Sequence, residues 1–333
     1  MTDPIALHRS LLTLDTHIDI PWPDGPDFRD NTRRRVDLPK MQHGHLVAGC
    51  FAAYVPQGPR TPEGHAAAYA RAVAMLEFIN TMAADRARVC SSADAIEQAH
   101  RDGATVIIPC VENGHALGGE LAHLAKFKAL GARYMTLTHN GHNALADSSN
   151  PRADLGDAPE LHGGLSAFGR EAIAEMNRLG LLVDIAHVAK STMMQAAALS
   201  RTPVLSTHSC IKALCNHPRN LDDEQLDMLR DVGGMVNITA VSGFLRAGAR
   251  PDLVTPSDYV DHLDYAVRRI GIAHVGISSD FDGGGGFNGW ADAGQSPSIT
   301  AELVKRGYDA AAIAALWGGN FLRILRAAEA AAA

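Results

Sequence analysis

The stretch Thr105-Val106-Ile107-Ile108-Pro109-Cys110-Val111-Glu112 is a short, almost unbroken apolar run that ends on a carboxylate. Its length and its β-branched residues are typical of a strand that is covered on both faces, as in an all-parallel sheet. Further apolar runs of this kind occupy residues 15–19, 46–55, 134–139, 181–187, 203–208, 234–239 and 274–280. The chain is therefore predicted to contain eight parallel strands.

Segments with apolar residues at helical spacing separate these runs, at residues 64–84, 92–101, 119–130, 168–179, 190–199, 222–230 and 257–270. This alternation predicts a (β/α)8 TIM barrel. A doubly wound open sheet is the competing layout, but it would not gather the polar ends of six strands into one site. Because no Ser/Pro/Gly-rich linker divides the chain, residues 1–333 are expected to form a single barrel domain. A final helix is expected from about Tyr308, with a frayed alanine-rich tail.

Six of the eight runs end on side chains that suit catalysis or metal binding. They are His17 with Asp19, then Glu112, His139, His187, His208 and Asp280. In a parallel barrel these ends meet at one mouth, where such barrels place their chemistry. His17 and Asp19 are two apart and point the same way on a strand, so both can reach one ion. With Glu112, His187 and His208 they form a ligand set without thiolates, which suits Zn²⁺ or a related ion and is large enough for two bridged ions.

Composition narrows the class of partner. The net charge of −7 argues against a nucleic acid or an anionic membrane as partner. The basic cluster Arg33-Arg34-Arg35 is interpreted as a solvated loop, and no apolar stretch reaches the ~18 residues of a membrane span.

The five cysteines include no CxxC pair, and the N-terminus shows no signal-peptide pattern. We therefore expect reduced, buried cysteines and a cytoplasmic protein.

An ordered set of motifs carries a resemblance to a known family. The motifs are Asp15 to Trp22, Val111-Glu112-Asn113-Gly114, Leu137-Thr138-His139, Gly164 to Arg170, Asn177 to Gly180, Asp184 to Val188, His208-Ser209, His217 to Leu221, Ser279 to Gly283 and Gly319 to Leu322. The chain resembles a bacterial-type member of the renal (membrane) dipeptidase family of zinc metallopeptidases. The resemblance implies one zinc held by His17, Asp19 and Glu112. It implies a second held by Glu112, His187 and His208, with Glu112 bridging.

The resemblance also assigns substrate binding and proton transfer to His139, Arg219 and Asp280. Asp280 could move a proton from the attacking zinc-bridged hydroxide to the leaving amine. His139 could donate to the carbonyl oxygen as charge develops there. Arg219 could grip the carboxylate that every dipeptide carries at its end. The run Gly283 to Gly286 is interpreted as a mobile loop that orders over substrate through Trp290.

Two departures from the family pattern leave the substrate open. The stretch Gly49 to Tyr54 lacks a Gln-Phe-Trp-like signature, and Thr239-Ala240-Val241-Ser242 lacks a pocket tyrosine. Dipeptides, including L-Xaa-D-Xaa, are the expected substrates, and family habit suggests a homodimer. The alternatives are another amidohydrolase-type activity on a cyclic amide, lactone or deaminable base, or a recruited binding role without peptidase activity.

Overall fold

The computed structural model describes residues 3–20 and 25–333, so Pro21 and Trp22 of the first motif lie outside the described residues. The strands are β1 (Leu14–Asp19), β2 (Ala48–Tyr54), β3 (Ala87–Val89), β4 (Thr105–Glu112), β5 (Tyr134–Thr136), β6 (Leu182–Asp184), β7 (Leu205–Ser209), β8 (Met235–Ile238) and β9 (Val275–Ile277). The α-helices are α1 (Pro4–Ser10), α2 (Leu38–His43), α3 (Pro62–Thr81), α4 (Ala93–Arg101), α5 (Ala122–Ala129), α6 (Ala167–Leu179), α7 (Lys190–Leu199), α8 (Asp223–Asp231), α9 (Ser242–Leu245), α10 (Pro256–Ile270), α11 (Pro297–Lys305), α12 (Ala310–Ala314) and α13 (Asn320–Ala331).

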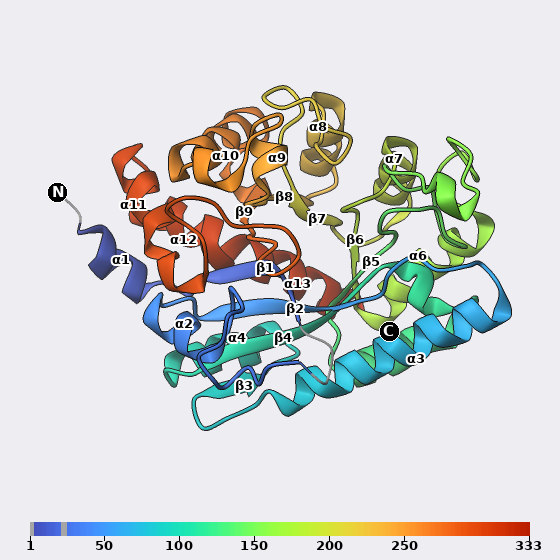
Figure 1. Ribbon diagram of the computed structural model, residues 1–333, viewed down its shortest axis with the longest axis horizontal. Helices are drawn as coiled ribbons and strands as arrows, with labels where there is room; N and C mark the ends of the chain where they lie inside the picture. The colour runs from blue at the N-terminus through green and yellow to red at the C-terminus, as the bar shows by residue number, and fades with distance from the viewer. Residues whose placement is uncertain (1–2, 21–24) are drawn as a thin grey trace.

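The strands form a parallel barrel with helices outside it (Figure 1). Neighbouring strands follow the order β1-β2-β4-β5-β6-β7-β8-β9, and every pair is parallel. Backbone bonds between the two ends of this order close the barrel: the Asp19 amide donates to the Phe281 carbonyl at 3.0 Å, and the Asp280 amide to the His17 carbonyl at 3.1 Å. The predicted (β/α)8 fold is confirmed.

Alternation along β4 explains why Glu112 faces the mouth. Val106, Ile108 and Cys110 belong to one buried apolar cluster, whereas Ile107 belongs to the other. Successive side chains of a strand point to opposite faces, so Glu112 continues the series of Val106, Ile108 and Cys110. Tyr134 of β5 belongs to the same cluster, and its hydroxyl reaches across to the Thr16 carbonyl of β1 at 3.0 Å. This face is therefore the barrel interior, and Glu112 caps it.

Local residues explain where two of the helices begin and end. Asp222 and Gln225 form a capping box at the start of α8, and Gly180 ends α6 with a φ of 66°. A left-handed residue at a helix end favours glycine because it has no Cβ to clash. All five cysteines are free and buried. Within residues 3–20 and 25–333, no helix combines the length and apolarity needed to span a bilayer.

Three expectations need correction. The final helix is not continuous, because a π-helical segment (Ala315–Gly319) separates α12 from α13. The short strand β3 was not predicted; it pairs only with β4 among the described strands and has too few residues to show a pattern. The basic cluster is not a fully solvated loop, because the Arg34 side chain is only 17% exposed and pairs with Asp282 at 3.2 Å.

The segment predicted as a mobile loop leads to a tryptophan that is packed into the fold. Trp290 is fully buried and lies edge-on to the rings of Phe281 and Tyr259 at centroid distances of 5.2 and 5.3 Å. A side chain so enclosed anchors the loop, so the expectation that the segment through Trp290 orders over substrate is wrong for Trp290. Gly283 and Gly284, at the start of the segment, line the central cavity.

Candidate active site

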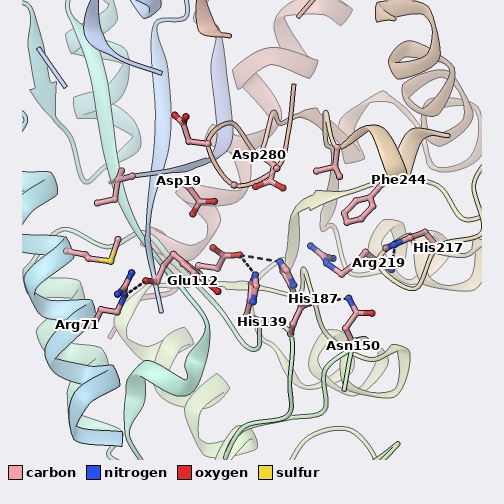
Figure 2. A pocket seen from close by; sticks show the side chains of 18 residues that line it. Asp19, Arg71, Glu112, His139, Asn150, His187, His217, Arg219, Phe244 and Asp280 are labelled. Carbon is pink, nitrogen blue, oxygen red and sulfur yellow. Dashed lines mark hydrogen bonds and ion pairs between the residues drawn. The ribbon is translucent and has the colours of Figure 1, made fainter. Parts of the chain in front are cut away.

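Glu112 is the centre of a cluster of histidines at the carboxyl end of the barrel (Figure 2). Its Oε2 lies 3.4 Å from Nε2 of His17. Its Oε1 lies 3.3 Å from Nε2 of His187, 3.7 Å from that of His208 and 3.8 Å from that of His139. Nε2 of His187 and Nε2 of His208 are 2.9 Å apart. The ends of four other strands therefore converge on the carboxylate that ends β4.

The ligand atoms fall into three overlapping groups, each with its atoms within 4.8 Å of one another. The groups are His17 with Glu112 and His208, Glu112 with His139 and His187, and His17 with Asp19 and Asp280. Two of these groups share Glu112, which is the arrangement that a binuclear site with a bridging carboxylate requires. Distance alone does not separate His139 and Asp280 from the five predicted ligands.

Unsatisfied buried atoms show that these residues fit a cation. Nε2 of His17 and Oδ1 of Asp19 are buried and find no hydrogen-bond partner among the described residues. A buried polar atom without a partner costs free energy, and a buried charge must be paired or bind metal. Asp19, Glu112 and Asp280 place three carboxylates in this buried space, so cations are the natural compensation.

The pKa values of the cluster report the same excess of negative charge. Burial opposes a proton on His17, but Glu112, Asp19 and Asp280 outweigh it and raise the pKa of His17 to about 10. Burial and the neighbouring Glu112 raise the pKa of Asp19 well above its usual range. Metal ions bind the deprotonated forms of both groups, so binding would displace these protons.

Hydrogen bonds behind two histidines fix which ring nitrogen faces the cluster. The Tyr134 hydroxyl donates its hydrogen to the Thr16 carbonyl. It therefore accepts a hydrogen bond from Nδ1 of His17, which lies 3.0 Å away. The Thr207 hydroxyl donates to Asp184 at 2.7 Å and likewise accepts from Nδ1 of His208 at 2.8 Å. Once metal binding has displaced the second proton of His17, each imidazole carries its remaining proton on Nδ1 and turns a bare Nε2 to the cluster, as a metal ligand requires.

Asp184 supports this arrangement as a hydrogen-bond acceptor. Its carboxylate accepts from the amides of Ala186 and Thr207 and from the hydroxyls of Thr136 and Thr207. Burial raises the pKa of Asp184, while these hydrogen bonds favour its charged form. These contacts tie Asp184 to β7 and, through the Thr207 hydroxyl, give it a role in orienting His208.

Replacing Tyr134 with phenylalanine is expected to weaken metal binding about 10- to 100-fold, as losses of such outer contacts do. The ring remains, but Nδ1 of His17 loses its acceptor. Metal affinity measured by chelator competition tests this. The matched control is Tyr259→Phe, because Tyr259 is also fully buried and, within residues 3–20 and 25–333, its hydroxyl bonds only backbone groups, the nearest 2.6 Å away at Ile238. Equal metal affinity in the two variants would contradict the role of Tyr134.

Asp280 sits at the closure of the barrel in a constrained backbone. Its φ is 59°, and those of Asp282 and His187 are 67° and 66°, all in the left-handed region that side chains other than glycine rarely adopt. A Cβ on Gly283 would lie 1.9 Å from Asp19 Oδ2 and 2.4 Å from Asp280 Oδ1, so only glycine fits there. Burial and the charge of Glu112 raise the pKa of Asp280, against His17 and Arg219, to about 7. Strain of this kind collects at functional sites.

His139 lies beside the cluster at the cavity wall. Its ring packs 4.0 Å from that of His187 and 4.8 Å from that of Tyr54. Burial lowers the pKa of His139 to about 4, although Glu112 acts in the opposite direction. At neutral pH the ring is therefore uncharged and can present an N–H to a substrate oxygen.

Arg219 is a buried cation at one side of the cavity. Its Nη2 donates to the His208 carbonyl at 3.2 Å, and its guanidinium carbon lies 5.5 Å from the centre of the Phe244 ring. Its Nε has no hydrogen-bond partner among the described residues. Burial lowers its pKa to about 10, which still leaves it charged at neutral pH. A buried, charged donor with an unmatched N–H suits an anionic ligand.

The cavity has a volume of about 480 Å³, enough for a small molecule. Its lining includes Asp19, Glu112, His139, His187, Arg219 and Asp280 among the predicted residues, whereas His17 and His208 are buried and do not line it. Of three further histidines near the mouth, His217 lines the cavity, whereas His115 and His142 do not.

Sequence reasoning missed other lining residues: Tyr54, Arg71, Met75, Asn140, Asn150 and Phe244. Tyr54 ends β2, so the strand-end rule could have found it. Arg71 and Met75 come from α3, and no strand-end signal marks them. Val241 and Phe244 occupy the region in which the family tyrosine is missing.

Comparisons with known proteins agree with the predicted resemblance. The family profile of membrane dipeptidase (peptidase family M19) matches residues 2–333, which span the whole cluster. The chain is 32% identical over 339 residues to Dipeptidase verJ of Clonostachys rogersoniana, covering 95% of this chain and 84% of that protein. It is similar to the structure of the probable dipeptidase PvdM from Pseudomonas aeruginosa, with a TM-score of 0.93 and 28% identity over 99% of this chain and 98% of that one. A metallo peptidase from Rhodobacter sphaeroides, solved with a phosphinate mimic of the dipeptide L-Ala-D-Ala, has a TM-score of 0.85 and 28% identity over 96% of this chain and 99% of that one.

Proposed function

The chain belongs to the membrane dipeptidase family of metallopeptidases, and from this premise we propose that it cleaves free dipeptides, L-Xaa-D-Xaa among them, at a site that holds two zinc ions. The observation that carries the proposal is the single carboxylate of Glu112 shared by two groups of histidines. The ligands would be His17, Asp19 and Glu112 for one ion, and Glu112, His187 and His208 for the other.

Nitrogen and oxygen ligands without thiolates suit zinc at a catalytic site. Bound there, the two zinc ions would activate a water near neutral pH and would polarise the substrate carbonyl. Asp280, beside Asp19 and His17, can hold a proton from the attacking water and return it to the leaving amine. The uncharged ring of His139 can donate to the carbonyl oxygen as negative charge develops on it.

The position of Arg219 indicates which class of substrate the site would bind. A guanidinium can hold a carboxylate through two parallel hydrogen bonds. Placed beside the cluster, it would hold the terminal carboxylate of a substrate only one residue beyond the cleaved bond, which favours dipeptides over longer chains. The L-Ala-D-Ala mimic bound by the Rhodobacter sphaeroides relative supports a D-residue at that position.

The competing amidohydrolase activities are less compatible with the cavity. Many such enzymes bridge their metals with a carboxylated lysine, and no lysine lines the cavity among the described residues. The carboxylate of Glu112 occupies the place where a bridging ligand is needed.

One experiment tests the proposed function. Chelator-treated protein is reloaded with zinc, and turnover is measured on L,L- and L,D-dipeptides, a tripeptide, cyclic amides, lactones and deaminable bases, with metal analysis of the same samples. We expect dipeptide cleavage that requires about two zinc ions per chain and is lost on chelation. Activity that survives complete metal removal, or turnover confined to the non-peptide substrates, would refute the proposal.

A further inference from the structure

The cavity carries a second arginine on the side opposite Arg219. Figure 2 shows Arg71 and Arg219 on either side of Glu112 and His139. Both arginines line the same cavity, although Arg71 comes from α3 and Arg219 from the loop after β7. A ligand that spans the metal cluster would therefore meet a cation on each side.

The position of Arg71 is fixed relative to the cluster by backbone contacts. Its Nε donates to the Tyr54 carbonyl at 3.0 Å. Tyr54 is the residue of β2 that pairs with Glu112 of β4, and the next residue, Val55, donates its amide to the Glu112 carbonyl at 3.0 Å. The guanidinium of Arg71 is thus joined to the strand pair that presents Glu112.

The orientation of the substrate follows from the proposed function, on which this inference rests. With the terminal carboxylate at Arg219 and the amide at the cluster, the N-terminal residue extends away from Arg219. Its side chain then points toward the wall formed by Tyr54, Arg71 and Met75. A short side chain with an anionic end would lay its methylene groups on Met75 and its charge on Arg71.

We propose that Arg71 selects dipeptides whose N-terminal residue is acidic, aspartate or glutamate. Among the carboxylates of the lining, Asp19, Glu112 and Asp280 face the cluster, and Asp282 pairs with Arg34 at 3.2 Å. Arg71 is the cation of the lining on the N-terminal side, and its half-buried position strengthens a charge-assisted hydrogen bond relative to bulk water.

The test compares kcat/KM for L-Glu-L-Ala, its neutral isostere L-Gln-L-Ala, and L-Lys-L-Ala on the zinc-loaded protein. We expect the glutamyl substrate to exceed the glutaminyl one by about 10-fold, the discrimination of one charge-assisted contact. Arg71→Gln should bring the ratio near one, and Arg71→Glu should favour L-Lys-L-Ala. Arg101→Gln, which removes one charge from exposed α4, is the matched control and should keep the wild-type ratio.

Each outcome decides the proposal. Equal kcat/KM for L-Glu-L-Ala and L-Gln-L-Ala in the wild type overturns it, as does a ratio that persists in Arg71→Gln. If Arg71→Gln does not fold, as judged by thermal unfolding, Arg71→Lys replaces it. Lysine keeps the charge but cannot form two parallel hydrogen bonds to a carboxylate. A glutamyl-to-glutaminyl ratio below that of the wild type supports the proposal, and an unchanged ratio overturns it. Failure to cleave any dipeptide refutes the proposed function as well, whereas cleavage of all three without discrimination refutes only the role of Arg71.

Discussion

Replacing Glu112 with glutamine is expected to abolish binuclear metal binding and to lower kcat/KM by about 10³-fold or more, because metal activation supplies several kcal/mol of transition-state stabilisation. Glu112 faces His17 through Oε2 and His187 through Oε1, so its two oxygens can bridge both groups. The amide keeps the volume of the carboxylate but supplies one weak acceptor and no charge. The loss of charge matters because Glu112 is buried among imidazoles that hold its pKa well below its usual range, against the effect of burial.

Metal stoichiometry and affinity, measured with turnover on the same sample, check this result. We expect at most one tightly bound ion per chain in the variant. Thermal unfolding without metal serves as the control for folding. Two zinc ions bound with wild-type affinity would show that Glu112 does not bridge them.

Replacing Asp280 with asparagine is expected to lower kcat by about 10²- to 10⁴-fold, the usual contribution of a general acid–base, while metal content stays near that of the wild type. Asparagine tolerates the left-handed backbone that Asp280 adopts at a φ of 59°, so the turn should survive. It also fits beside Gly283, because the substitution adds no heavy atom. Only the capacity to take and return a proton is lost.

The Asp280→Asn variant separates catalysis from ligation because Asp280 lies within 4.8 Å of ligand atoms of His17 and Asp19. If Asp280 were a zinc ligand, the variant would lose metal together with activity. Metal analysis alongside a dipeptide assay at saturating zinc distinguishes the two roles. A variant that loses its metal would contradict the assignment of Asp280 as the acid–base. A variant with wild-type metal content and wild-type turnover would contradict it as well.

The polar strand ends could be predicted from the sequence because the apolar run and the polar residue that ends it are adjacent in the chain. Each strand is a short apolar run, and the residue that ends it is its neighbour in the chain. A parallel barrel then brings those ends together whatever the details of packing. The residues from His17 to Asp280 that the runs identified do converge around Glu112, and Arg219 lies beside them.

The supporting contacts were not readable, because they join residues far apart in sequence. Tyr134 looks like an ordinary strand residue, and only the barrel closure brings its hydroxyl 3.0 Å from Nδ1 of His17. Arg34 looked like part of a solvated basic loop, yet it donates to the Asp19 carbonyl and pairs with Asp282. Neither composition nor periodicity encodes such partners.

The sequence by itself determined the barrel and the inventory of ligand-type residues at its strand ends, because each of those residues is the neighbour in the chain of the apolar run that marks its strand. The tertiary structure alone decided which nitrogen of His17 and of His208 faces the cluster, and that Arg71 of α3 stands across the cavity from Arg219. A helix pattern tells which side is buried, but not which polar side chain at its edge reaches the mouth of the barrel. That depends on how α3 is set against β2 and β4, which only long-range packing fixes.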